Sequence, residues 1–119
     1  MAGSIFDSMN IKNTHLKNRI YVTPMVTTFS KVDTGKVEPE TVEHYRQLAM
    51  GEPGLIIQEA TCINEDGRLM DRQLGVWDDT HIEGLSKIVK AVHEQNCAIF
   101  LQIHHAGIVG ISQHPVCPD

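Results

Sequence analysis

Side chains that can act as bases or metal ligands follow two apolar runs of the sequence. Glu59 ends one run, and a carboxylate in that position is a candidate general base. His104 and His105 end a later run, with His114 and Cys117 downstream, and zinc sites are built from such ligands. Adjacent histidines on a strand point to opposite faces, so both rings cannot easily reach one ion. The pair is therefore expected to pack or to anchor a loop, with a metal site as the alternative.

The cysteines carry little catalytic signal. Cys62, Cys97 and Cys117 are odd in number and widely spaced, and no two of them form a Cys-x-x-Cys pair. This pattern argues against a disulfide framework and against a zinc site. The Cys62 thiol would be reactive if its pKa were lowered, but no basic residue adjoins it in the sequence. The default expectation is a cytoplasmic protein.

Composition excludes two classes of partner. The 119 residues include 15 acidic and 10 basic side chains, a formal net charge of -5, and the basic ones are scattered singly. A nucleic-acid partner is not expected, because a phosphate footprint needs clustered Lys and Arg. No apolar run approaches the ~20 residues that span a bilayer, and the first residues lack the basic and apolar segments of a signal peptide. No membrane partner is expected either.

Short apolar runs must form the strands that position these side chains. The second and third runs show no polar alternation in their centres, as the strands of a parallel sheet covered on both faces require. The predicted strands are residues 19–23, 54–59 and 98–103. Ahead of them a small hairpin is expected, in which residues 9–11 and 15–17 flank a Lys12-Asn13-Thr14 turn.

Two amphipathic helices are predicted between the strands. The first spans residues 39–50 and begins with Pro39, where the missing N–H would have had no helical partner anyway. The second opens near Thr80, which is expected to form a capping box with Glu83, and it ends near Asn96. The predicted buried faces are Val42, Tyr45, Leu48 and Ala49 on the first helix, and Ile82, Leu85, Ile88, Val89 and Val92 on the second.

The resulting order, β-α-β-α-β, predicts an α/β fold. Right-handed crossovers place both helices on one side of a parallel sheet, as in a barrel wall. A (β/α)8 TIM barrel takes about 250 residues, and this chain supplies its first three β/α units after the N-terminal hairpin. The outer strands would then have unpaired edges, which soluble proteins normally avoid. Residues 1–119 are therefore predicted to be the N-terminal portion of a single barrel domain, apparently truncated.

Five segments together resemble the Old Yellow Enzyme family of NAD(P)H:flavin oxidoreductases. They occur in the family's order and spacing and cover most of the chain, from about residue 5 to residue 110. The matching segments are residues 16–25, 43–46, 54–61, 75–79 and 100–107.

The resemblance implies that FMN binds at the C-terminal mouth of the barrel, where the loops after the strands build the site. It places Pro24 and Met25 against the isoalloxazine ring, and Ala60 where a small side chain lets the ring approach the backbone. The Gln102 amide would bond the pyrimidine side of the flavin, whose alternating donors and acceptors an amide can match. The implied cofactor-binding residues are Thr23, Pro24, Met25, Val26, Ala60 and Gln102.

Two residues depart from the family pattern. Val26 stands where many relatives have a Cys or Thr that touches the flavin carbonyl, and Val cannot supply that hydrogen bond. A different redox potential is expected if FMN binds. Ile108 stands where relatives usually have Arg, which alters the contacts of that loop. The resemblance also implies that Glu59 is structural and pairs with a neighbour in the barrel.

The function implied by the resemblance is that of an FMN-dependent NAD(P)H oxidoreductase of the ene-reductase type. Its small-molecule substrate would be an activated alkene, such as an enone or a dienoyl compound. The family's substrate-gripping and proton-donating residues lie on later strands, so no catalytic residue is assigned here. One alternative is a non-catalytic, truncated half barrel that forms a homo-oligomer through its open sheet edges. Another is an unrelated barrel enzyme that uses Glu59 and the histidines with a metal.

Overall fold

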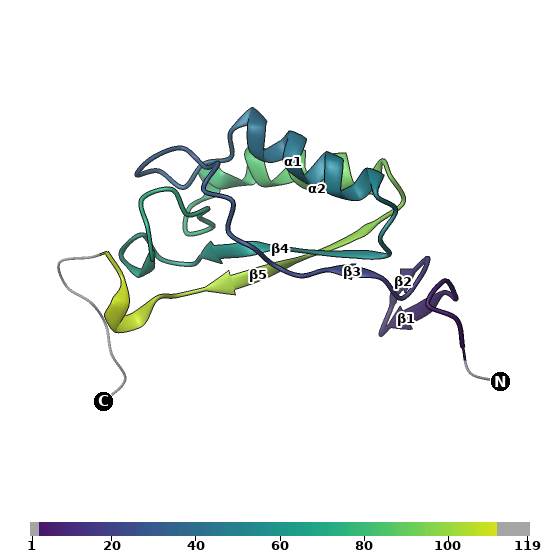
Figure 1. Ribbon diagram of the computed structural model, residues 1–119. Coiled ribbons are helices and arrows are strands. Elements are labelled where there is room, and N and C mark those ends of the chain that lie inside the picture. Colours follow the sequence, from purple (N-terminus) through teal and green to yellow (C-terminus); the bar gives the residue numbers. More distant parts are fainter. Residues whose placement is uncertain (1–2, 112–119) are drawn as a thin grey trace.

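A three-stranded parallel sheet forms the centre of the molecule. The computed structural model describes residues 3–111 (Figure 1). The sheet has the order β3-β4-β5, and the separate hairpin pairs β1 with β2 in antiparallel orientation. The strands are β1 (Met9–Ile11), β2 (Thr14–Leu16), β3 (Tyr21–Val22), β4 (Leu55–Cys62) and β5 (Ala98–His104).

Two helices cover one face of this sheet, as the crossover rule predicts (Figure 1). Helix α1 (Pro39–Met50) connects β3 to β4, and helix α2 (Ile82–His93) connects β4 to β5. The α/β class and the β-α-β-α-β order are thereby confirmed. Among residues 3–111, no helix combines the length and the apolar character that crossing a bilayer would demand.

The apolar core lies between the two helices and the sheet. Ile56, near the start of β4, is completely buried against both helices. The predicted faces supply most of the other members, whereas Leu74 comes from the loop after β4 and Cys97 from the turn before β5. The buried residues of the core are Tyr45, Ala49, Ile56, Leu74, Ile88, Val92 and Cys97.

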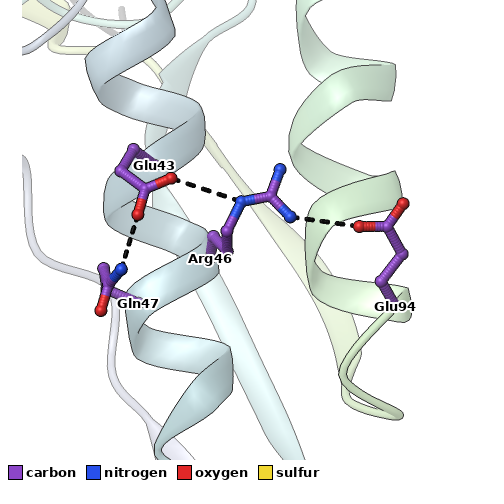
Figure 2. Close-up of polar contacts among 4 residues, drawn as sticks. All are labelled: Glu43, Arg46, Gln47 and Glu94. Carbon is purple, nitrogen blue, oxygen red and sulfur yellow. Dashed lines mark hydrogen bonds and ion pairs between the residues drawn. The ribbon is translucent and has the colours of Figure 1, made fainter.

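Helix α1 begins and ends for local reasons. Pro39 occupies its first turn, as predicted, and Glu52 takes a left-handed conformation (φ 62°) just after its end. On the outer surface, Arg46 links the two helices (Figure 2). Its Nε lies 3.3 Å from a carboxylate oxygen of Glu43, and its Nη1 lies 3.1 Å from Glu94 at the end of α2. These pairs are partly exposed, so each contributes little to stability.

The start of helix α2 differs from the prediction. A 3₁₀ turn (Asp79–His81) precedes the α-helix, and the Asp78 carboxylate accepts a hydrogen bond from the Thr80 N–H at 2.8 Å. The predicted Thr80–Glu83 capping box is therefore wrong, because the acceptor lies two residues earlier and Glu83 instead pairs with Lys87. Ile82 is also not part of the buried face and is 58% exposed, because it occupies the first position of the helix.

The strand boundaries also differ from the prediction. Strand β3 has two residues because the chain leaves the sheet after Val22, whereas β4 extends three residues beyond Glu59 to Cys62. The hairpin loop is shorter than expected, since Thr14 already pairs with Ile11. The expected coverage of both sheet faces is absent among residues 3–111, where the helices lie on one face only (Figure 1). As a result, three consecutive residues of β5, from Leu101 to Ile103, are exposed.

Candidate flavin-binding site

The candidate residues lie at the edge of the sheet where the parallel strands end. The hairpin is at the opposite end of the molecule, and the arrowheads of β4 and β5 point away from it (Figure 1). Residues 23–26 follow β3 directly, whereas Ala60 and Gln102 lie in the second halves of β4 and β5. The ladder continues beyond both of them, to Cys62 and His104. All six predicted residues nevertheless lie toward the C-terminal ends of the parallel strands.

A β-bulge brings Ala60 and Gln102 together. Gln58 pairs with Leu101 and Thr61 with Ile103, so two residues of β4, Glu59 and Ala60, stand opposite the single residue Gln102. Bulges of this kind re-aim side chains and are frequent at barrel rims and beside active sites. Gln102 and Ala60 thus lie next to each other in the register of adjacent strands.

Side chains satisfy the backbone groups that the bulge removes from the regular ladder. The Glu59 N–H donates to the Tyr45 phenol oxygen at 2.8 Å, and the Thr61 hydroxyl donates to the Glu59 carbonyl at 2.8 Å. The Gln73 amide nitrogen donates to the Ala60 carbonyl at 3.1 Å. Buried backbone groups need such partners, so these contacts stabilise the bulge.

The Glu59 carboxylate connects the bulge to the segment after β3. It is 1% exposed and accepts hydrogen bonds from the Thr27 N–H at 3.0 Å, the Thr27 hydroxyl at 2.9 Å and the Tyr45 hydroxyl at 3.2 Å. Burial, and then the negative charge of Glu59, raise the pKa of the Tyr45 phenol far above its usual value, so Tyr45 stays protonated. The prediction that Glu59 pairs with a neighbour is confirmed by these contacts.

Residues 23–26 form an open surface between two fixed points. Val22 pairs with Ile56 at the start of this segment, and Thr27 is bonded to Glu59 at its end. Within the segment Met25 is 68% exposed, while Pro24 and Val26 are half-buried. An exposed methionine beside an anchored backbone is suited to contact a flat ring.

Gln73 is a site residue that the sequence analysis missed. It is fully buried, accepts a hydrogen bond from the Leu69 N–H at 2.7 Å, and places its amide nitrogen 3.0 Å from His104 Nδ1. Together with its bond to Ala60, these contacts fix the loop after β4 to the ends of β4 and β5. A lone glutamine in a charged stretch gives no signal in the sequence that it is buried.

The histidines show roles of the kind expected from packing and loop anchoring. His104 faces Gln73, and His105 Nδ1 accepts a hydrogen bond from the Gly107 N–H at 3.0 Å. Within residues 3–111, no three His, Cys, Asp or Glu side chains are grouped as metal ligands would be. His114 and Cys117, which the metal alternative also used, lie outside the described residues.

The two buried thiols, Cys62 near the site and Cys97 at the other end of the sheet, are unreactive in character. Burial raises the pKa of Cys62 and of Cys97, which disfavours the nucleophilic thiolate. Cys62 Sγ lies 3.0 Å from the Asn64 carbonyl oxygen, as a weak donor would. Neither thiol therefore resembles a catalytic nucleophile.

The donor set fits the polar edge and the flat face of a flavin. The exposed Gln102 amide offers one acceptor and two donor hydrogens, and Ala60 beside it adds little bulk. Half-buried Pro24 and exposed Met25 present apolar surface at the same edge of the sheet.

Comparison with known proteins gives a consistent family assignment. Over 107 residues the chain is 44% identical to an NADPH dehydrogenase of Bacillus subtilis (strain 168), covering 90% of this chain and 32% of that protein. An old yellow enzyme homologue from Zymomonas mobilis superposes with a TM-score of 0.91 at 32% identity, over 98% of this chain and 33% of the other. Morphinone reductase in complex with tetrahydroNAD gives a TM-score of 0.90 at 28% identity, over 99% and 33%.

The chain thus spans about a third of the length of the relatives it matches. The model of one flavoprotein family matches residues 4–116, which is almost the whole sequence. This match agrees with the resemblance shown by the five segments. The chain belongs to the NADH:flavin oxidoreductase / NADH oxidase family.

Proposed function

We propose that this chain supplies part of the FMN site of an NAD(P)H-dependent oxidoreductase of the ene-reductase type. In such an enzyme the chemistry that bound FMN would supply is hydride transfer between NADH or NADPH and an activated alkene. The substrate would be a small molecule, such as an enone or a dienoyl compound. The NADPH dehydrogenase relatives and the nicotinamide analogue on morphinone reductase support this proposal.

The observation that carries the proposal is the pairing of Gln102 with the bulge at Ala60. In a chain of this family, it gives one edge of the sheet an amide, a small side chain and the open segment 23–26. Gln102 would bond the flavin pyrimidine, Ala60 would leave space for the ring, and Pro24 and Met25 would lie against it. Half-buried Val26 offers no polar hydrogen, so it would leave the flavin carbonyl without a side-chain donor at that position.

We also propose that residues 1–119 form the first three β/α units of a (β/α)8 barrel domain. The parallel sheet with both helices on one face is the geometry of a barrel wall, and the flavoprotein relatives are about three times as long. The groups that grip the alkene and donate a proton would then belong to later strands of the same barrel. This chain would contribute binding and orientation of the cofactor.

A titration with FMN tests the cofactor assignment. The purified chain is titrated while flavin fluorescence is followed, alongside Gln102→Leu and a control, Gln47→Leu. Gln47 is an exposed glutamine on α1 whose amide donates to Glu43, so it reports the general effect of the substitution. Stoichiometric binding that Gln102→Leu weakens about 10-fold, and Gln47→Leu does not, is the expected result. No binding by the folded chain, or equal binding by both variants, would refute the assignment.

A second candidate function is a non-catalytic fragment that self-associates. The observation that favours it is β5, an edge strand whose Leu101 is 38% exposed and whose Ile103 is 68% exposed. Pairing of two such edges across a two-fold axis would produce a homo-oligomer. Light scattering during gel filtration tests this: a dimer that Ile103→Lys dissociates would support it, and a monomer would contradict it. Cytoplasmic residence and the lack of nucleic-acid or membrane partners stay predictions.

A further inference from the structure

We propose that Glu59 is a positioning residue of the flavin site. Its buried carboxylate fixes the segment 23–26 relative to the bulge that presents Ala60 to the ring. This inference rests on the proposed function, because it concerns how the same FMN site is held in shape. The hydrogen-bonded group of Glu59, Thr27 and Tyr45 is called the Glu59 cluster below.

The Glu59 cluster is held by hydrogen bonds and not by a counter-ion. Three donor groups from two different residues converge on the carboxylate, at 2.9 to 3.2 Å. Among residues 3–111, the ion pairs join Arg46 and Lys87 to surface glutamates, and none involves Glu59. A buried carboxylate needs such donors to offset its desolvation, so the three groups are confined to one arrangement around it.

One residue thereby controls both sides of the candidate site. Thr27 directly follows Val26, and its N–H and hydroxyl are both bonded to Glu59, which fixes the end of the open segment. On the other side, Glu59 directly precedes Ala60 in the bulge, and its own N–H is bonded to Tyr45. A change in the carboxylate is therefore transmitted to the surface of Pro24 and Met25 and to the backbone of Ala60.

The donor groups of Thr27 and Tyr45 require a hydrogen-bond acceptor at the position of the Glu59 side chain. Each oxygen of an ionised carboxylate accepts hydrogen bonds, so the Thr27 N–H, the Thr27 hydroxyl and the Tyr45 hydroxyl can all donate to it. A glutamine of the same size has a single acceptor oxygen, and its NH2 group would face one of these donors. Glu59→Gln therefore keeps the volume, loses part of the cluster and releases the segment 23–26.

The test compares FMN binding in matched variants of the whole chain. Glu59→Gln is the main variant, Thr27→Val removes a single donor, and Glu43→Gln is the control because its carboxylate lies on the exposed surface of α1. FMN affinity is measured by fluorescence quenching at a temperature where circular dichroism shows every variant to be folded. Two further readouts are the hydrogen exchange of the Thr27 amide and the visible absorption spectrum at saturating FMN.

The expected result for Glu59→Gln is an affinity about 10- to 100-fold lower, with a displaced flavin absorption band and faster exchange at Thr27. Thr27→Val should weaken binding about 3- to 10-fold, and Glu43→Gln should bind like the unmodified chain. A purely structural role would lower the folded fraction but leave the affinity and spectrum of the folded protein unchanged. If Glu59→Gln does not fold, Thr27→Val decides the question by the same readouts.

Two results would overturn the proposal, and they are distinguishable. If the unmodified chain binds FMN and the folded variants bind it equally well with the same spectrum, Glu59 does not position the flavin, while the proposed function survives. If the folded, unmodified chain shows a protected Thr27 amide but binds no FMN, the flavin assignment fails and the role of Glu59 fails with it.

Discussion

Replacing Tyr45 by Phe removes a single oxygen atom and is expected to destabilise the fold strongly. The ring stays, so apolar packing around this residue, which is 2% exposed, is retained. The lost hydroxyl accepts from the Glu59 N–H at 2.8 Å and donates to the Glu59 carboxylate at 3.2 Å. Both partners remain buried without that oxygen, and an unsatisfied buried donor costs about 1–3 kcal/mol.

The magnitude follows from adding these two losses. The unpaired Glu59 N–H costs about 1–3 kcal/mol, and the longer bond to the carboxylate adds about 1 kcal/mol. We therefore expect Tyr45→Phe to lower the free energy of unfolding by about 2–4 kcal/mol. The chain has two tyrosines, and the other, Tyr21, is 59% exposed. Tyr21→Phe is thus a matched control, expected to change stability by less than about 0.5 kcal/mol.

Urea unfolding followed by far-ultraviolet circular dichroism measures both variants. The midpoint of Tyr45→Phe should fall at an unchanged slope, because the same surface is exposed on unfolding. A loss below about 1 kcal/mol, or one equal to that of Tyr21→Phe, would show that the phenol does not satisfy the bulge.

Three other outcomes follow from named contacts. Above about pH 10, stability should fall more steeply in the unmodified chain than in Tyr45→Phe, because the raised phenol pKa lets the unfolded state ionise first. Below that pH the two proteins should show the same dependence of stability on pH, and unfolding midpoints at pH 8 and 11 measure it. Gly75→Ala should destabilise the fold by several kcal/mol, since the new Cβ would overlap the Trp77 ring, and thermal unfolding would show a lowered midpoint. Arg46→Met should cost less than about 1 kcal/mol in urea unfolding, because both of its ion pairs are partly exposed.

The order of the elements could be predicted because apolar periodicity and helix signals agree. Ile56 lies in an uninterrupted apolar run, and Pro39 marks the start of α1 as expected. The errors occur where a short polar contact competes with the simplest signal. The start of α2 is an example, since Asp78 bonds to Thr80 and displaces the expected capping box.

Less of the candidate site could be predicted from the residues themselves. The family resemblance indicated Ala60 and Gln102 as site residues. Apolar periodicity, however, does not indicate that β4 has a bulge opposite Gln102 of β5. The bulge depends on Tyr45 and Gln73, which come from a helix and a loop far along the chain. Long-range hydrogen bonds of this kind are invisible to a pattern that compares only near neighbours in sequence.

The two sides of the candidate site differ in how much of their structure this chain supplies. On the side of β3 and β4, the Glu59 cluster satisfies the bulge and anchors the segment 23–26 with groups contained in these residues. On the side of β5, Gln102 lies between exposed Leu101 and Ile103 on an edge strand. The shape of the first side is therefore set locally, whereas the orientation of the Gln102 amide depends on whatever covers β5. A chain that binds FMN weakly but shows a protected Thr27 amide would have this asymmetry, and covering the β5 edge would then raise its affinity.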